Sequence, residues 1–169
     1  MIHIYGSKYR TKNDDFKQLM VRDSFTKTLF IFNDNEKEHN SSKAGAGNAI
    51  MRMYNSYSNI EIPRSHGIPT GVYRKGYDKL DEKTKEVIDE SIDELKELLS
   101  TGNYDSIMYS IEDERSFVLG TSLFKVNREV LVYITKCLLS LGEKYFIVLN
   151  TEIIDEFIPI TGDILDSIE

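Results

Sequence analysis

The chain has 169 residues, of which 40% are hydrophobic and 29% are charged, a composition typical of a folded globular protein rather than a disordered one. Its length fits one domain over residues 1–169. A formal net charge of -7 argues against broad nucleic-acid binding, because neutralising many phosphates needs an excess of Lys and Arg. No apolar run approaches the ~18 residues of a membrane span and the N-terminus is unlike a signal peptide, so we expect no membrane contact and a cytoplasmic location.

Apolar patterns predict strands and helices that alternate along the chain. Strands are predicted at residues 2–5, 28–32, 104–111 and 145–149, with a further short strand that ends near Ile68. The runs TLFIF and YFIVL are continuously apolar, which is typical of strands buried on both faces. Helices are predicted at 47–54, 81–100 and 128–141, and residues 112–125 are predicted to be loop. Residues 8–27 are also predicted to be mainly loop, with one helical turn near residues 16–20.

This alternation favours right-handed crossovers between parallel strands. We therefore predict an α/β fold, a three-layer α/β/α sandwich with a mostly parallel central sheet. Residues 151–169 form an acidic C-terminal extension that still carries several isoleucines and Phe157. We expect this extension to pack on the domain or on a second copy of the chain.

Three polar, glycine-bearing loops follow predicted strands. They are the segment 33–35 with the glycine loop KAGAGN after it, the segment 68–71 and the segment 119–122. Because ligands of open α/β sheets collect at the carboxyl ends of the strands, we expect these loops to form one binding site. The candidate ligand-binding residues are Asn33, Asp34, Asn35, Gly45, Gly47, Asn48, Arg52, Thr70, Gly71, Gly120, Thr121 and Ser122.

The glycine loop is the most informative of the three. Gly45 and Gly47 lead directly into a predicted helix, whose first N–H groups lack partners inside the helix and carry partial positive charge. Such a loop can cradle a phosphate without a basic surface. Alternatively, the glycines only permit close packing of the helix on a strand.

The other loops offer polar groups of the kind that hold a nucleotide. Asp34 could accept hydrogen bonds from an adenine amino group or from ribose hydroxyls, or else cap the strand end as a turn residue. The segment 119–122 could hold a second phosphate or be an ordinary connection. Arg52 and Arg64 could neutralise a phosphate or lie on the surface.

Few side chains are suited to catalysis. His66 lies beside the segment 68–71 and could act as a general base at neutral pH, although a lone histidine can equally be structural. Asn48, His66 and Asp34 are the catalytic candidates. The single cysteine, Cys137, has apolar neighbours at helical spacing, so we expect it to be buried and unreactive. His3 and His39 have no metal-ligand spacing, and we expect neither a metal nor a cofactor.

The order of these motifs resembles that of an uncharacterised group of small phage and large-virus proteins. The matching segments are LFIFNDN, AGAGNAIMR, GIPTG and LGTSLFKVN, which together extend from about Thr28 to Leu141. The pattern in that group reads LFxFGDN, a glycine-rich loop, GIPT and LGTG. Asn33 and Ser122 stand where the pattern has glycine.

The same arrangement is similar to the macro domain, an α/β/α fold that binds ADP-ribose. The resemblance implies that Asp34 contacts adenine, that Gly45, Gly47 and Asn48 hold the ribose and diphosphate, and that residues 120–122 close over the phosphates. The family's catalytic Asn, in an Ala-Asn pair ahead of the glycine loop, has no counterpart before Gly45.

These observations lead to two functional expectations. The first is a macro-like protein that binds a phosphorylated nucleotide such as ADP-ribose, either as a sensor or sponge or as an ADP-ribosyl or nucleotide-diphosphate hydrolase. The second is a catalytically inert viral protein that associates with itself as a homodimer, or with a host protein, through its acidic face and C-terminal extension.

Overall fold

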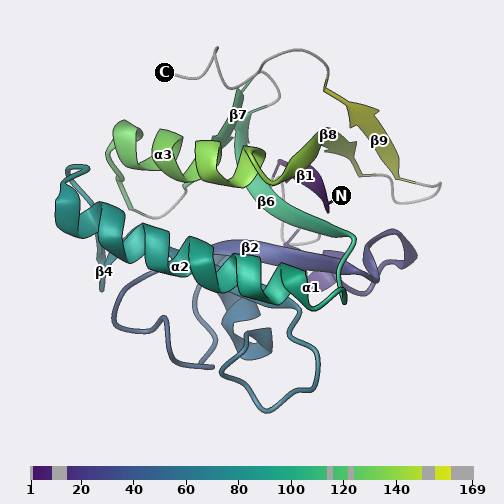
Figure 1. Cartoon of the computed structure of the whole chain (residues 1–169), viewed down its shortest axis with the longest axis horizontal. Coiled ribbons are helices and arrows are strands. Elements are labelled where there is room, and N and C mark those ends of the chain that lie inside the picture. Colours follow the sequence, from purple (N-terminus) through teal and green to yellow (C-terminus); the bar gives the residue numbers. More distant parts are fainter. Residues whose placement is uncertain (1, 9–14, 114–115, 122–123, 150–154, 161–169) are drawn as a thin grey trace.

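The fold is a mixed α/β structure built on a mostly parallel sheet (Figure 1). The computed structural model describes residues 2–8, 15–113, 116–121, 124–149 and 155–160. The main sheet has the strand order β3-β2-β6-β1-β8-β9, with β7 paired to β6. Its strands are β1 (Ile2–Ser7), β2 (Thr28–Asp34), β3 (Ser65–Pro69), β6 (Ser106–Asp113), β7 (Ser116–Leu119), β8 (Gly142–Val148) and β9 (Glu156–Pro159).

Five neighbouring strands of this sheet are parallel and end at the same edge. β8 pairs with β1, β1 with β6, β6 with β2 and β2 with β3, all in parallel register. Asp34 at the end of β2 lies opposite Pro69 at the end of β3, and Ser7 at the end of β1 lies opposite Ser110. The loops that follow these strands therefore gather at one edge of the sheet.

Both faces of the sheet are buried, as the continuous apolar run of β2 predicts. Leu29 and Ile31 face a core that they share with the helices α2 (Glu82–Ser100) and α3 (Arg128–Leu139). Phe30 and Phe32 face the opposite core, which includes residues from α1 (Phe16–Leu19) and from the 3₁₀ helices η2 (Asp23–Phe25) and η3 (Gly47–Tyr54). Alternate side chains of β2 thus pack against the helices on the two opposite faces of the sheet.

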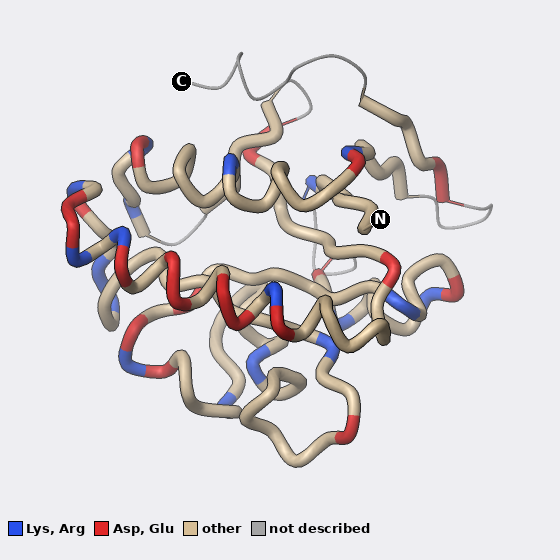
Figure 2. Tube along the Cα trace, viewed as in Figure 1, with Lys and Arg blue, Asp and Glu red and all other residues tan. Residues whose placement is uncertain are grey.

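The helix α2 illustrates how its sequence fixes its position. The Asp81 side chain caps the first turn by accepting a hydrogen bond from the Thr84 backbone N–H at 2.8 Å. Ile88, Ile92 and Leu95 are buried at helical spacing. The opposite face carries the charged residues seen along α2 in Figure 2. Figure 1 places α2 and α3 on the same side of the sheet.

Several predictions from the sequence were wrong in detail. Residues 112–125 are not all loop, because Phe117, Val118 and Leu119 are buried in β7, which pairs antiparallel with β6. In residues 8–27, α1 confirms the helical turn predicted near residues 16–20, whereas η2 was not predicted. A small hairpin, β4 (Gly71–Val72) with β5 (Lys75–Gly76), follows β3. These elements are two to four residues long, too short to show a period in the sequence.

The described part of the C-terminal extension packs on the domain. β9 pairs antiparallel with β8, and the Phe157 ring lies 5.1 Å from the Tyr5 ring. Residues 151–154 and 161–169 lie outside the described residues.

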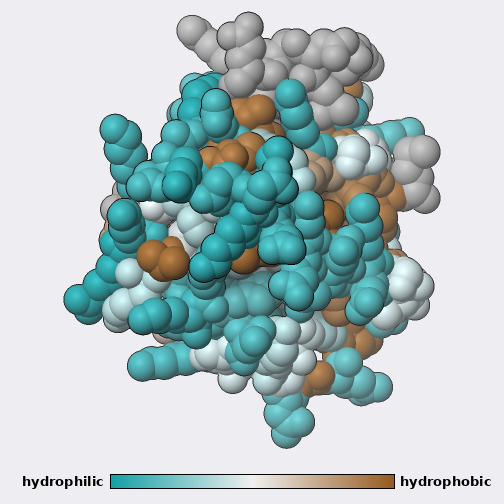
Figure 3. Space-filling view, turned by 60° about the vertical axis from the view of Figure 1, so that its left-hand side comes forward, coloured by the Kyte–Doolittle hydropathy of each residue, from teal (hydrophilic) through white to brown (hydrophobic). Residues whose placement is uncertain are grey.

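One face of the molecule is mainly polar. The face seen in Figure 3 carries mainly hydrophilic side chains, with hydrophobic atoms in separate small areas. Within the described ranges, no helix combines the length and the apolar character that crossing a membrane needs.

Candidate functional site

A cavity of about 820 Å³ lies at the edge where the parallel strands β1, β2, β3 and β6 end. Its lining includes Lys8 after β1, residues 33–35 at the end of β2, Thr70 after β3 and Ser110 to Glu112 in β6. This volume is in the range of small-molecule sites, and the place is the one that open α/β sheets use for ligands. The three predicted loops do meet here.

The two glycines of the glycine loop have different roles. A Cβ on Gly45 would lie 2.9 Å from both the Ala49 Cβ and the Arg52 Nη1, so Gly45 is required for close packing. Gly47 has a φ of 57°, and a Cβ there would meet nothing within 4 Å. Gly47 therefore needs to be glycine for its backbone conformation, and it faces open space.

The start of η3 lines the cavity and carries backbone N–H groups that have no partner within the helix. The first hydrogen bond within this helix runs from the Ala49 N–H to the Ala46 carbonyl, at 3.1 Å. The N–H groups of Gly47 and Asn48 precede it, and no side chain caps this end of η3. Such N–H groups at a helix start favour an anion.

Asp34 is engaged by protein groups rather than free for a ligand. Its side chain has no exposed surface. Oδ1 accepts hydrogen bonds from Arg52 Nη2 at 2.7 Å and Nε at 3.1 Å, and from the Asn35 N–H at 2.9 Å. Burial favours the neutral carboxyl, but the hydrogen bonds from His39 and Arg52 outweigh it and lower the pKa of Asp34. A direct contact of this carboxylate with adenine would require displacing Arg52 or His39.

Arg52 joins the end of β2 to the glycine loop. Besides Asp34, it contacts Glu38 at 3.0 Å and donates to the Lys43 carbonyl at 3.0 Å. The residue is only 2% exposed, so the expectation that Arg52 lies on the surface was wrong. Its guanidinium neutralises Asp34 and holds the loop 43–47 against the strand.

His39 extends this network to α2, a role that the sequence did not reveal. Its Nδ1 lies 3.2 Å from Asp34 Oδ2 and its Nε2 lies 3.0 Å from Glu94 Oε1. Burial opposes protonation of His39, but the hydrogen bonds to Asp34 and Glu94 outweigh burial and raise its pKa. The network therefore connects Asp34, which lines the cavity, to the helix α2.

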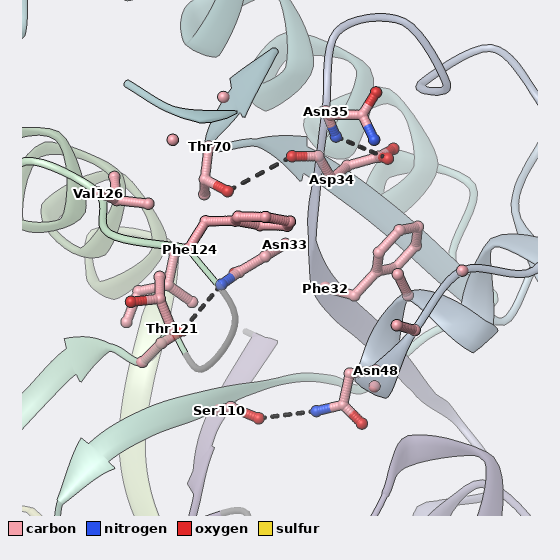
Figure 4. Close-up of a pocket in the computed structure, with 18 of the residues that line it drawn as sticks. Phe32, Asn33, Asp34, Asn35, Asn48, Thr70, Ser110, Thr121, Phe124 and Val126 are labelled. Atoms are coloured by element: carbon pink, nitrogen blue, oxygen red, sulfur yellow. Dashed lines mark hydrogen bonds between the residues drawn. The ribbon is translucent and has the colours of Figure 1, made fainter. Parts of the chain in front are cut away.

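Two asparagines tie the walls of the cavity together (Figure 4). The Asn33 side chain donates to the Gly120 carbonyl at 2.8 Å. The Asn48 side chain accepts from the Phe16 N–H at 2.9 Å and donates to the Ser110 hydroxyl at 2.9 Å. Both amides are thus engaged in holding β2, β6 and η3 in place.

Two predicted candidates lie away from the cavity lining. His66 is 3% exposed and its Nε2 donates to the Ser91 carbonyl of α2 at 2.7 Å. Burial lowers the pKa of His66 to about 4, so the ring is neutral at pH 7. Arg64 donates to the Phe25 carbonyl at 2.7 Å and is not part of the lining. Ser122 lies outside the described residues.

The lining also includes cationic and aromatic side chains that were not predicted from the sequence. They are Lys8, Lys43, Tyr73, Arg74, Lys75 and Phe124. With Arg52, the described lining residues include five cations against three carboxylates, a net positive charge in a chain of formal charge -7. The segment GVYRKG, which overlaps and follows GIPTG, could have indicated these residues, because two glycines flank an aromatic and two cationic side chains.

These features define the class of protein: a mixed α/β protein with a positively charged cavity at the carboxyl edge of its parallel strands. No family model, curated protein or solved structure matched the chain when it was compared with each of these. No group of three or more His, Cys, Asp or Glu within the described ranges is placed to hold a metal ion.

Proposed function

We propose that the protein binds a phosphorylated nucleotide of the ADP-ribose type in this cavity. The observation that carries the proposal is the local reversal of charge: an acidic chain concentrates cations around a cavity of about 820 Å³. A polyanionic small molecule is the ligand class that this charge distribution favours. The resemblance to macro domains points to the same ligand class.

The diphosphate belongs at the start of η3. Gly47 and Asn48 line the cavity there and no side chain caps the helix start, and the exposed Lys43 stands four residues before Gly47. Backbone donors and one ammonium group suit a diphosphate, whose charge is spread over several oxygens.

Aromatic side chains provide the surface for a base or a ribose. Tyr73 and Phe124 each have 48% of their surface exposed and both line the cavity. A nucleotide base stacked on an aromatic ring gains about 1–3 kcal/mol without base-specific hydrogen bonds. This mode of binding does not depend on Asp34.

Binding without hydrolysis fits the geometry better than catalysis. The side chains of Asn48 and Asp34 are engaged in protein hydrogen bonds, and His66 lies outside the lining. None of the described lining residues is a histidine. We therefore propose a sensor or sponge for the nucleotide rather than a hydrolase.

Thermal shift and calorimetry with ADP-ribose, NAD and AMP test this proposal. A ligand at 100 times its Kd stabilises the folded state by about 2.7 kcal/mol, which a melting curve detects. Lys43→Gln should weaken binding of ADP-ribose, whereas Lys96→Gln, a matched loss of one exposed charge on α2, should not. If none of the three nucleotides shifts the melting curve, the proposal is wrong.

Product analysis separates binding from hydrolysis. ADP-ribosylated protein and ADP-ribose incubated with the wild-type protein should remain intact while calorimetry detects binding. Release of ADP-ribose or AMP in proportion to protein concentration would instead make the protein a hydrolase.

A further inference from the structure

The hairpin that follows β3 is firmly anchored at its base. The Gly71 carbonyl accepts a hydrogen bond from the Glu36 N–H at 3.0 Å, and the Thr70 carbonyl accepts one from the Tyr77 N–H at 2.9 Å. A Cβ on Gly71 would lie 2.1 Å from the Lys75 carbonyl oxygen, so the two strands of the hairpin approach closely there. The base of this hairpin is therefore fixed relative to the end of β2.

The tip of the hairpin holds an arginine in an unfavourable backbone conformation. Tyr73 and Arg74 form its two-residue turn, since Val72 pairs with Lys75. Arg74 has a φ of 64°, the only positive φ of a non-glycine residue in the described ranges. Glycine or asparagine adopts this conformation at lower cost, and residues held in such conformations cluster at functional sites.

The Arg74 guanidinium is positioned for an anion. It lies 5.1 Å from the centre of the Tyr73 ring, a cation–π contact that restricts its freedom. Across the described ranges, no carboxylate forms an ion pair with it. The Nζ of the neighbouring Lys75 lies 4.0 Å from Asp78 Oδ2, and both side chains are more than 70% exposed. Such an exposed ion pair contributes little to stability.

The hairpin and the glycine loop belong to different ends of the cavity. In Figure 4, Thr70, which precedes the hairpin, and Asn48, which follows Gly47, lie on opposite sides, with Asn33 and Phe32 between them. The lining includes cations from both segments: Lys43 from the glycine loop, and Arg74 and Lys75 from the hairpin.

We propose that the hairpin tip is a second anion subsite, selective for a phosphate monoester. The preferred ligand, on the basis of the proposed function, is a nucleotide with two separate phosphate groups: a diphosphate or phosphate at the start of η3, and a monoester at Arg74 and Lys75. A monoester adds about 1.5 to 2 negative charges at pH 7 and three acceptor oxygens. The forked guanidinium can bind two of these oxygens at once.

Paired ligands that differ by one phosphate monoester test the subsite. The pairs are ADP-ribose with ADP-ribose 2′-phosphate, and AMP with adenosine 3′,5′-bisphosphate, measured by calorimetry on the wild-type full-length chain. We expect the extra monoester to tighten binding about tenfold or more in at least one pair, the gain of one hydrogen bond to a charged group.

Variants at the tip assign the preference to the hairpin. Arg74→Gln and Arg74→Gly should remove the preference. Both variants also take away one of the cations that line the cavity, so the affinity for the ligand without the monoester should fall as well, but by less than the affinity for the ligand that carries the monoester. Arg74→Gly also relieves the backbone conformation, so its melting temperature should not fall, and a lost preference then reflects the missing guanidinium. Lys96→Gln, which removes an exposed charge from α2, should keep the preference.

The outcomes separate the two proposals. Equal affinities within both ligand pairs, with ADP-ribose bound, would overturn the second subsite and leave the proposed function standing. A preference that survives in Arg74→Gly would place the monoester elsewhere and overturn the inference. If no nucleotide binds at all, both proposals fail.

Discussion

His66 makes the stability of the fold depend on pH in a direction that can be calculated. Its ring is buried between β3 and α2 and donates to the Ser91 carbonyl at 2.7 Å. Burial lowers its pKa from 6.5 to about 4, although the bond to Ser91 partly offsets burial. The unfolded chain therefore binds a proton near pH 6.5, which the folded protein accepts only near pH 4.

This difference gives the sign and the size of the effect. Above pH 6.5 the His66 contribution to stability is fully present, and it is lost as the pH falls toward 4. At 1.36 kcal/mol per pKa unit the complete loss is roughly 3 kcal/mol, of which about 2 kcal/mol is lost between pH 7 and pH 5.

Urea unfolding of the wild type and of His66→Gln between pH 4 and pH 8 measures this contribution. Glutamine can keep a donor toward Ser91 but does not titrate. The difference in unfolding free energy between the two proteins should shrink by about 2 kcal/mol from pH 7 to pH 5. A difference that stays constant over this range would refute the buried, neutral state of His66.

His39 provides a control of opposite sign. Its pKa is raised by Asp34 and Glu94, so its contribution is fully present below pH 6.5 and is lost as the pH rises through the raised pKa. The difference in unfolding free energy between the wild type and His39→Gln should therefore shrink toward high pH, where the contribution of His66 is fully present.

Three further predictions concern the charged network and the loops. Arg52→Met should destabilise the fold by about 3–5 kcal/mol in urea unfolding, because it leaves Asp34 buried without its partner. The double variant Arg52→Met with Asp34→Leu should recover part of this loss of stability. Equal losses in the single and the double variant would contradict the pairing of Arg52 with Asp34. Gly47→Ala should cost about 1–2 kcal/mol from its φ of 57° alone, and a fully stable variant would contradict that conformation. Arg74→Gly should be as stable as the wild type or more stable by up to about 1 kcal/mol, and a clear loss would show that the arginine supports the fold.

Much of the fold could be predicted because its main elements have strong local patterns. The run TLFIF predicted a strand buried on both faces, and β2 is confirmed as such a strand. The helix predicted at 81–100 is confirmed as Glu82–Ser100, with its buried residues at helical spacing. β7 and β9 were not predicted, because each has only four residues and is held by antiparallel pairing with the strand before it rather than by a pattern of its own.

The position of the candidate site was easier to predict than its chemistry. Asn33, Gly47 and Thr70 do lie at one cavity, because parallel strands bring their carboxyl ends together. The sequence could not show that Asp34 is occupied by Arg52, 18 residues further on, since that contact depends on how η3 packs against β2.

His66 is a case in which a signal was present in the sequence. It precedes Ile68 by two residues, so both side chains point to the same face of β3. Ile68 is apolar and lies in the core shared with α2, so the same alternation places His66 in the core beneath α2 rather than at the strand end.

The contact between Arg52 and the Lys43 carbonyl means that the glycine loop has its shape before any ligand arrives. A loop that is already ordered loses little conformational entropy on binding, so more of the interaction energy remains as affinity. Association should then resemble docking to a rigid surface, with small differences between the free and bound backbones. The buried arginine would influence the affinity without touching the ligand.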